Sequence, residues 1–227
     1  MKKIAVIPAY NEAGNIEKTV QDIIENAPSF DYLVINDCSQ DKKEEICKKN
    51  GFPIINLPIN MGIGGGVQTG YLYALRNGYD IAVQFDGDGQ HDAKYLEKMA
   101  EVLEKENIDM VIGSRYIIKE GFQSTEMRRI GIRFFANLIK VLTGQSITDP
   151  TSGMRMINKN VLQIFAENYP KDYPEPESVV TLLKNDMKVK EIPVCMKERK
   201  EGVSSISPIN AVYYMIKVSV AVLIAAL

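Results

Sequence analysis

Short apolar runs alternate with helical patterns over the first 115 residues of the chain. A short apolar run predicts a buried strand, whereas apolar residues three and four positions apart predict one face of a helix. Ile16, Val20 and Ile23 show the helical spacing, and Pro28 ends that helix. The predicted strands are 3–7, 32–36, 54–57, 81–85 and 110–112, and further helices are expected near 41–49, 66–77 and 93–106. This alternation predicts an α/β fold with a parallel sheet covered by helices.

The regular alternation of apolar runs and helical patterns ends after Arg115. A charged connection at 116–127 is followed by a helix near 130–143, a strand at 154–157, helices near 159–167 and 177–185, and an extended pair around 189–198. The last segment, 209–227, is apolar and carries one charge, Lys217. Since a bilayer span needs ~20 apolar residues, this segment is borderline. We expect a catalytic domain at 1–206 and an apolar helix at 207–227 that contacts either a membrane or a second subunit of a homo-oligomer.

Length and composition narrow the class of protein. With 227 residues, 45% of them hydrophobic, the chain can bury one sizeable core. A formal net charge of -2 gives no attraction to polyanions, so nucleic acid is not an expected partner. The three cysteines form no C-x-x-C pair, which indicates reduced thiols instead of a disulfide framework. The apolar run after Met1 stops at Pro8, too early for a signal peptide, so we expect a cytoplasmic protein.

The strand at 81–85 delivers two carboxylates, Asp86 and Asp88, to its C-terminal end. Ligands bind at that end of the strands in open α/β sheets, and the neighbouring glycines allow close approach. Two hard oxygen ligands suit Mg²⁺ or Mn²⁺ bridging a diphosphate. The alternative is an acidic turn without a ligand. His91, the single histidine, is either a further neighbour of the metal or phosphate, or a solvated residue at a helix start.

Two further polar clusters follow earlier strands, at 8–12 and 36–39. If the strands are parallel, both clusters lie at the same sheet edge as Asp86, and Asp37 is placed to accept hydrogen bonds from a base or ribose. Capped strand-to-helix turns are the alternative. The glycine-rich run at 60–70 does not match G-x-G-x-x-G, which argues against a Rossmann site. It still suits a helix start near nucleotide phosphates or the nucleoside.

Six motifs occur in a fixed order along the chain: PAYNE at 8–12, NDCS at 36–39, NMGIGGG at 60–66, FDGDGQH at 85–91, GSRY at 113–116 and DPTSGMR at 149–155. In this order and spacing they resemble the family 2 glycosyltransferases of the GT-A fold, over about residues 3–206. The resemblance is strongest to the polyprenyl-phosphate hexosyltransferase branch typified by dolichyl-phosphate mannosyltransferase. It implies a mixed, mostly parallel sheet, a nucleotide diphosphate sugar donor and Mg²⁺ or Mn²⁺.

The resemblance also implies roles for individual residues. Those expected to hold the nucleoside are Pro8, Ala9, Tyr10, Glu12 and Asp37, and those expected to organise metal and diphosphate are Asp86, Asp88 and Gln90, with His91 as a candidate metal neighbour. Residues expected near donor or acceptor phosphates are Arg115, Arg128, Arg129, Arg199 and Ser204, and Gly64 and Arg155 are further expected substrate contacts. Ser205 departs from the pattern, because the lipid-phosphate enzymes carry a basic residue there.

The expected chemistry is an inverting displacement at the anomeric carbon, with Asp88, Arg115 and Asp149 as catalytic residues. Negative charge on the departing nucleotide is stabilised by the metal and Arg115. A saccharide hydroxyl would need a general base, for which Asp149 is the first candidate, followed by Glu175 and Glu177. A phosphate acceptor would need none. We expect a hexose to pass from a UDP-sugar to a membrane-associated lipid phosphate or lipid-linked saccharide of cell-surface polysaccharide synthesis, at the inner face of the membrane.

Alternatives remain at this stage. The acceptor is a soluble saccharide in one of them, and the protein is a non-catalytic GT-A scaffold in another. A phosphatase of the haloacid-dehalogenase type shares the Asp-x-Asp motif but opens its chain with it and carries Thr or Val where Gln90 stands. A sugar-1-phosphate nucleotidyltransferase needs an N-terminal glycine-rich loop with Arg and Lys, which 8–15 lacks.

Overall fold

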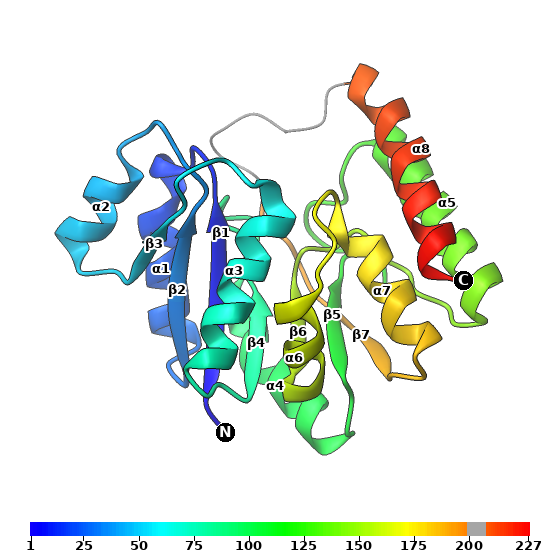
Figure 1. The fold of residues 1–227 in the computed structure, drawn as a ribbon, viewed down its shortest axis with the longest axis horizontal. Coiled ribbons are helices and arrows are strands. Elements are labelled where there is room, and N and C mark those ends of the chain that lie inside the picture. The colour runs from blue at the N-terminus through cyan, green and yellow to red at the C-terminus, as the bar shows by residue number, and fades with distance from the viewer. Residues whose placement is uncertain (199–207) are drawn as a thin grey trace.

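The computed structural model describes residues 1–198 and 208–227, except for the side chains of 208–212. In this part of the chain seven strands form one sheet in the order β3-β2-β1-β4-β6-β5-β7 (Figure 1). The strands are β1 (Lys3–Ala9), β2 (Phe30–Asn36), β3 (Ile54–Asn56), β4 (Ile81–Gln84), β5 (Met110–Ser114), β6 (Arg155–Asn158) and β7 (Val189–Pro193). The helices are α1 (Ala13–Asn26), α2 (Lys43–Asn50), α3 (Gly62–Arg76), the 3-10 turn η1 (Ala93–Tyr95), α4 (Leu96–Lys105), α5 (Glu126–Thr143), α6 (Lys159–Glu167), α7 (Pro174–Lys184) and α8 (Pro208–Ala225).

Strand β6 is the exception in an otherwise parallel sheet, because it runs antiparallel to both β4 and β5. Its first residue, Arg155, pairs with Gln84 at the end of β4 and with Ile112 of β5. The loop before β6 therefore enters the sheet at the edge where the parallel strands end. The expected α/β fold, with a mixed and mostly parallel sheet flanked by helices, is confirmed.

The core consists of two apolar layers, one on each face of the sheet. Ala5 and Ile7 of β1 belong to the layer that includes α1 and α4, and Ile4 and Val6 belong to the layer that includes α3, α6 and α7. Alternate residues of a strand point to opposite faces, so a strand covered on both sides is apolar throughout. This burial explains why the run at 3–7 predicted a strand.

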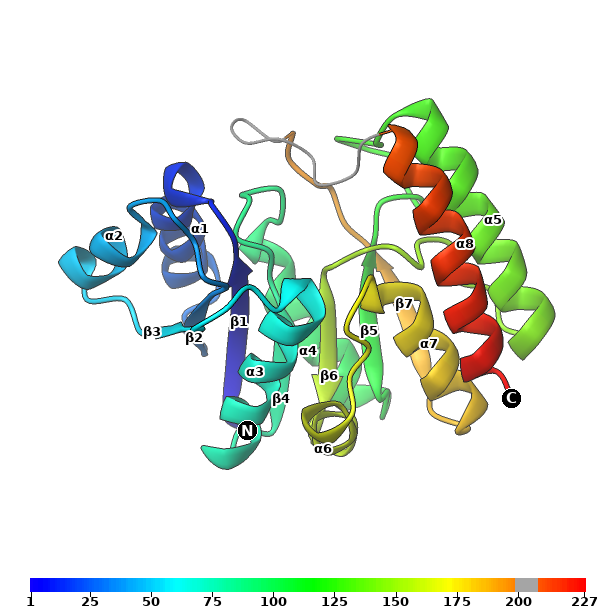
Figure 2. The same cartoon turned by 45° about the horizontal axis from the view of Figure 1, so that its top comes forward.

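Helices α5 and α8 lie side by side at the end of the molecule opposite α1 and α2 (Figures 1 and 2). The ring of Tyr214 lies 5.7 Å from the ring of Phe135 in α5 and 4.6 Å from that of Tyr173, the residue before α7. Within the described residues, no helix has both the length and the hydropathy required to cross a bilayer. The division at residue 206 stays a prediction.

Helix boundaries differ from the sequence expectation where the cap residues were not recognised. Helix α5 starts at Glu126, not near 130, because the Thr125 side chain accepts a hydrogen bond from the Arg128 amide and caps it. Helix α7 starts at Pro174 instead of 177, since proline suits the first helical turn.

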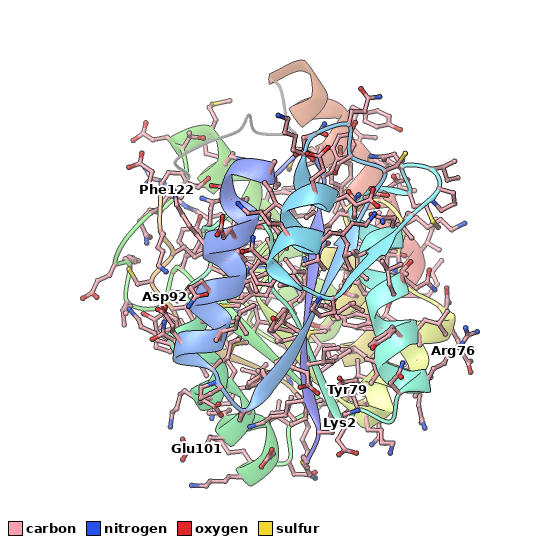
Figure 3. All side chains as sticks on the ribbon, turned by 90° about the vertical axis from the view of Figure 1, so that its left-hand side faces the viewer. Lys2, Arg76, Tyr79, Asp92, Glu101 and Phe122 are labelled. Atoms are coloured by element: carbon pink, nitrogen blue, oxygen red, sulfur yellow. The ribbon has the colours of Figure 1, made fainter. Side chains whose placement is uncertain are left out.

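Lys2 and Tyr79 lie at the edge of the sheet where β1 and β4 begin. The Lys2 Nζ lies over the ring of Tyr79, 4.1 Å from its centroid (Figure 3).

Candidate functional site

The loops after β1, β2 and β4 are joined by backbone hydrogen bonds at the carboxyl edge of the sheet. The Asp37 amide donates to the Ala9 carbonyl at 3.1 Å, and the Gly87 amide donates to the Pro8 carbonyl at 3.3 Å. The three polar clusters expected from the sequence therefore do meet at one edge. Pro8 and Ala9 contribute mainly backbone, because both are buried.

Asp86 is held in one orientation by two side chains. Gln84 Nε2 donates to Asp86 Oδ1 at 2.9 Å, and the Asp86 amide donates to His91 Nδ1 at 3.0 Å. His91 Nε2 lies 3.6 Å from Asp86 Oδ2. Gln84 is fully buried and was missed at the sequence level, although a glutamine inside an apolar strand was a usable signal.

His91 is buried against the backbone and the carboxylate of Asp86. The imidazole is 97% buried, its Nδ1 accepts the backbone hydrogen bond, and its Nε2 is directed at the Asp86 carboxylate. The Asp86 amide therefore occupies Nδ1, whereas Nε2 lies beyond hydrogen-bond distance of the Asp86 carboxylate. His91 supports the backbone that carries Asp86, and its expected place as a neighbour of the metal stays a prediction.

Asp88 and Gln90 lie in the turn after β4. Asp88 Oδ1 accepts from the Gln90 amide at 3.0 Å. Gln90 in turn accepts from the Lys197 amide at 2.8 Å, which ties this turn to the segment after β7. Among the described residues, no group of three or more His, Cys, Asp or Glu side chains is arranged to hold a metal ion.

A missing Cβ at Gly153 leaves room for Asp86. A Cβ at position 153 would lie 2.4 Å from Asp86 Oδ2, so any side chain there would displace the carboxylate. Asp86 and Asp88 present hard oxygens at a strand end, with glycines on three sides, and such a donor set fits Mg²⁺ or Mn²⁺ together with diphosphate oxygens. The residues present therefore fit the metal that the sequence predicts.

The residues expected to hold the nucleoside include two acids, Asp37 and Glu12. Asp37 is 5% exposed, and its Oδ1 accepts from the Met61 amide at 2.6 Å. Glu12 accepts from the Asn15 side chain at 2.9 Å, and Tyr10 is half exposed at the same edge. Oδ2 of Asp37 accepts no hydrogen bond from any residue that the structure describes.

Lys43 is a buried cation beneath these carboxylates that the sequence did not reveal. Its side chain is fully buried and its Nζ donates to Ser39 Oγ at 2.7 Å. Burial lowers the Lys43 pKa to about 8, although the charges of Asp41, Glu12 and Asp37 oppose the shift. Only the fold brings this lysine inside, because its sequence position at a helix start is typical of a solvated residue.

Gly64 packs closely against the chain, and its expected ligand contact stays a prediction. A Cβ at this position would lie 2.2 Å from the Pro170 carbonyl oxygen and 2.3 Å from that of Lys171. The start of α3 therefore lies directly against the segment that leads to α7. This contact brings the glycine-rich helix and the α7 loop together beside the sheet edge.

Arg115 and Asp149 form a bidentate ion pair after β5. Arg115 Nε donates to Asp149 Oδ2 at 2.7 Å and Nη2 donates to Oδ1 at 2.8 Å. Burial alone would lower the Arg115 pKa, but hydrogen bonds and charge from Asp149 outweigh it and raise the pKa. The Asp149 carboxylate also accepts from the Arg115 amide and is fully buried. This geometry does not suit the expected general base, because every lone pair of Asp149 is directed at a donor.

Glu191 of β7 fixes the backbone that carries Asp149. Its carboxylate accepts from the Thr148 amide at 2.7 Å, the Thr148 hydroxyl at 3.0 Å and the Asp149 amide at 2.7 Å. Burial is the main reason that the Glu191 pKa is raised. The residue was missed at the sequence level, since nothing in a strand at 189–193 indicates which loop it meets.

Arg155 is another correction to the expected substrate contacts. The guanidinium is 99% buried and donates to the carbonyls of Ser152, Pro150 and Glu175 and to the Ser178 hydroxyl. These bonds clamp the loop before β6 onto the start of α7. Arg155 thus holds the loop before β6 against α7, and its guanidinium is too buried to contact a substrate.

Glu175 lies in the first turn of α7 and is only partly buried. Burial raises its pKa to about 7, against the opposing charge of Arg155. The charges of Asp86 and Arg115 also act on the Glu175 pKa, in opposite directions. A carboxyl group whose pKa lies near 7 can take up or release a proton near neutral pH.

A cationic cavity adjoins Arg115. It measures about 520 Å³ and is lined by Tyr116, Lys119, Gln123, Arg129, Ile132, Arg133 and Thr148. Arg129 Nε is buried and finds no hydrogen-bond partner in the described chain. Arg128 is exposed on α5 close by. Of the expected phosphate contacts, Arg199 and Ser204 lie outside the described residues.

A comparison with protein-family models identifies the family of this chain. Residues 4–165 match the family model described as Glycosyl transferase family 2. The UDP-N-acetylglucosamine–dolichyl-phosphate N-acetylglucosaminyltransferase of Methanococcus voltae is 27% identical over 83% of this chain and 83% of its own. The polyprenol monophosphomannose synthase of Mycolicibacterium smegmatis is 26% identical over 96% of this chain and 86% of its own.

The fold has a counterpart among solved structures. Glucosyl-3-phosphoglycerate synthase from Mycobacterium tuberculosis, in complex with Mn²⁺, uridine diphosphate and glucosyl-3-phosphoglycerate, superposes with a TM-score of 0.75. The likeness covers 99% of this chain and 79% of that chain at 16% sequence identity. It therefore concerns the fold.

Proposed function

Because the chain belongs to glycosyl transferase family 2, and so is a glycosyltransferase, we propose that it moves a hexose from a UDP-sugar to the phosphate of a polyprenyl-type lipid. One observation carries this proposal. The acidic donor end, with Asp86 and Asp88, and the Arg115–Asp149 ion pair lie at the same sheet edge, and the cationic cavity adjoins the ion pair. A sugar donor at the carboxylates and an anionic acceptor in the cavity would then occupy separate places.

The donor side supports a uridine nucleotide. Asp37 Oδ2 is placed to accept the N–H of a uracil ring, since it has no protein donor among the described residues. The Methanococcus voltae relative is named for a UDP-sugar, and the solved counterpart holds uridine diphosphate. Both names support UDP as the nucleotide here.

A divalent cation belongs to the proposed reaction. Asp86 and Asp88 would hold Mg²⁺ or Mn²⁺, which supplies positive charge for the leaving diphosphate when bound. Gln84 and His91 keep the Asp86 oxygens in position before the donor arrives. Arg115 Nη1, which donates no hydrogen bond within the described residues, is the group that would reach the phosphates.

The acceptor side supports an ionised phosphate. Lys119, Arg129 and Arg133 give the cavity three cationic side chains, and phosphate is the group that such a cluster binds. An acceptor phosphate oxygen would attack the anomeric carbon with inversion while the carbon–oxygen bond to UDP breaks. Because that oxygen is already ionised, no side chain has to take a proton, and Asp149 is left to orient Arg115. The names of both curated relatives support a polyprenol or dolichol phosphate acceptor.

A hydroxyl acceptor is the second candidate, and Glu175 is the observation that favours it. A carboxyl with a pKa of about 7, on which the charges of Asp86 and Arg115 act, is suited to take the proton of a sugar hydroxyl. The acceptor would then be a lipid-linked or soluble saccharide. Glu175→Gln separates the two, because it should abolish transfer to a hydroxyl and leave transfer to a phosphate nearly unchanged.

Location and domain division follow from the acceptor. A lipid acceptor requires the protein to work at a membrane surface, and reduced thiols favour the cytoplasmic side. We assign the catalytic domain to residues 1–206 and membrane contact, or contact with a second subunit, to 207–227.

A transfer assay tests the function. The protein is incubated with radiolabelled UDP-glucose, UDP-N-acetylglucosamine, UDP-galactose, GDP-mannose or dTDP-glucose and a polyprenyl phosphate in detergent, with Mn²⁺ or Mg²⁺. We expect label in the organic phase with one UDP-sugar. Transfer from GDP-mannose alone would refute the donor, and product only with a saccharide acceptor would refute the phosphate.

A further inference from the structure

An exposed apolar stripe runs along the outer side of α5. Met127, Ile130, Phe134 and Val141 recur at helical spacing, and Ile130 and Val141 are 61% and 82% exposed. The opposite side of the helix already buries Ile132, Phe135 and Ile139 in the core. A surface helix of a globular protein has one apolar face, so among the residues that the structure describes nothing accounts for the second stripe.

The α5 stripe borders α8. Gly131 packs against Met215, since a Cβ at Gly131 would lie 3.1 Å from Met215 Sδ. Met127 and Phe134 stand four positions before and three positions after Gly131, so they share the side of α5 that meets α8. The stripe is therefore continuous with the neighbouring helix and not isolated on α5.

Helix α8 extends the apolar surface. Its exposed residues recur three and four positions apart and are Tyr213, Ile216, Val220, Leu223 and Ile224. Together with Met127, Ile130, Phe134 and Val141 of α5 they form one surface, here called the α5–α8 face. Both helices lie at one end of the molecule, as two views show (Figures 1 and 2).

Cations accompany the apolar stripe on α5. Arg129, Arg133 and Lys140 each directly precede a stripe residue, so they form a row beside it. The helix also carries Arg128, against one acid, Glu126, although the chain as a whole has a net charge of -2. Positive charge is therefore concentrated at an apolar face of an acidic protein.

We infer that the α5–α8 face docks on an anionic bilayer. Apolar side chains beside a row of cations suit a surface with acidic headgroups and an acyl boundary below them. A second copy of the chain fits less well, because a two-fold interface would bring the cation rows of both copies together. Charge thus favours the membrane as the occupant.

Docking in this way presents the acceptor cavity to the bilayer. Arg129 and Arg133 line the cationic cavity, and their helix also carries the apolar stripe. A lipid whose chain stays in the membrane would then bring its phosphate to the cavity beside Arg115. This step rests on the proposed function, whereas docking itself needs neither donor nor acceptor.

Vesicle flotation tests the inference. Vesicles of phosphatidylcholine, with and without phosphatidylglycerol, are mixed with the full chain and contain no acceptor lipid. We expect binding to the anionic vesicles, weakened by high salt. Ile130→Ser combined with Val141→Ser should lower it roughly tenfold, and Lys140→Gln should lower it on anionic vesicles only. Ile24→Ser on α1, an exposed apolar residue at the other end of the molecule, is the matched control.

Three outcomes would overturn docking. They are failure of the wild-type protein to float, equal flotation of wild type and double variant, and a double variant that becomes monomeric in light scattering with flotation unchanged. The last would assign the face to a second copy. Since both substituted side chains are largely exposed, thermal unfolding should confirm intact folding. A failed transfer assay with successful flotation would refute the proposed acceptor and leave docking standing.

Discussion

The Asp86 carboxylate occupies the space in which a side chain at position 153 would lie. A Cβ at position 153 would lie 2.4 Å from Asp86 Oδ2 and 3.1 Å from Gln84 Nε2. The loop before β6 can pass this close to the donor end only without a side chain. The absence of a side chain at Gly153, just before β6, thus allows the Asp86 carboxylate to keep its position after β4.

Gly153→Ala should therefore impair the donor site. The methyl group forces Asp86 out of the position fixed by Gln84 and His91, and we expect UDP affinity in the presence of Mn²⁺ to fall roughly tenfold or more. Titration calorimetry measures it. Gly66→Ala is the control, because its Cβ would meet Pro8 Cβ at an ordinary 3.6 Å. Equal losses in both variants would contradict the assignment.

Metal removal should act through Asp88. We expect chelation to weaken UDP binding by wild-type protein at least tenfold, because the diphosphate loses its counter-charge, while Asp88→Asn protein binds weakly with or without Mn²⁺. Asp186→Asn, an exposed position in the loop after α7, should behave like wild type. Full Mn²⁺ dependence in the Asp88 variant would mean that another group holds the cation.

Arg115→Lys should reduce turnover about 100-fold, because an ammonium cannot hold Asp149 with two bonds and also reach a phosphate. Asp149→Asn should have a similar effect by releasing the guanidinium. Steady-state kinetics measure both, and Arg76→Lys, exposed at the end of α3, is the control. If Asp149→Asn loses transfer to hydroxyl acceptors alone, Asp149 is the base after all.

Lys43→Met should weaken UDP binding roughly tenfold, since three nearby carboxylates lose their counter-charge. Because the Lys43 pKa is about 8, wild-type affinity should also decline as pH rises through that value, and the variant should lack this decline. The measurement is UDP affinity against pH. Lys48→Met on the surface of the same helix should follow wild type, and identical profiles for all three proteins would refute the role.

Glu175→Gln should remove one component of the pH dependence of stability. The Glu175 pKa is raised from 4.5 to about 7, so between these values the native state holds a proton that the unfolded chain has released. Wild-type stability therefore declines as pH rises through this window. Melting temperatures against pH should show a smaller decline for the variant. Glu167→Gln is the control, and parallel curves for Glu175→Gln and wild type would contradict the shift.

The sequence by itself determined the fold class and the edge at which the site lies. Apolar runs such as 81–85 predict buried strands because backbone pairing and burial on both faces leave few other choices. Parallel strands end at one edge of a sheet, so Asp37 and Asp86, which follow β2 and β4, lie at the same edge. The family motifs carry the same information.

Tertiary structure decided which of these polar groups remain available to a ligand. Arg155 and Asp149 have polar side chains suited to a site, yet partners from other elements occupy their hydrogen-bonding groups. Lys43 is buried near the carboxylates of Asp41, Glu12 and Asp37, and its own sequence context does not predict this burial. Hydrogen-bond saturation depends on which loops meet in space, and a pattern of residue types along the chain contains no such distances.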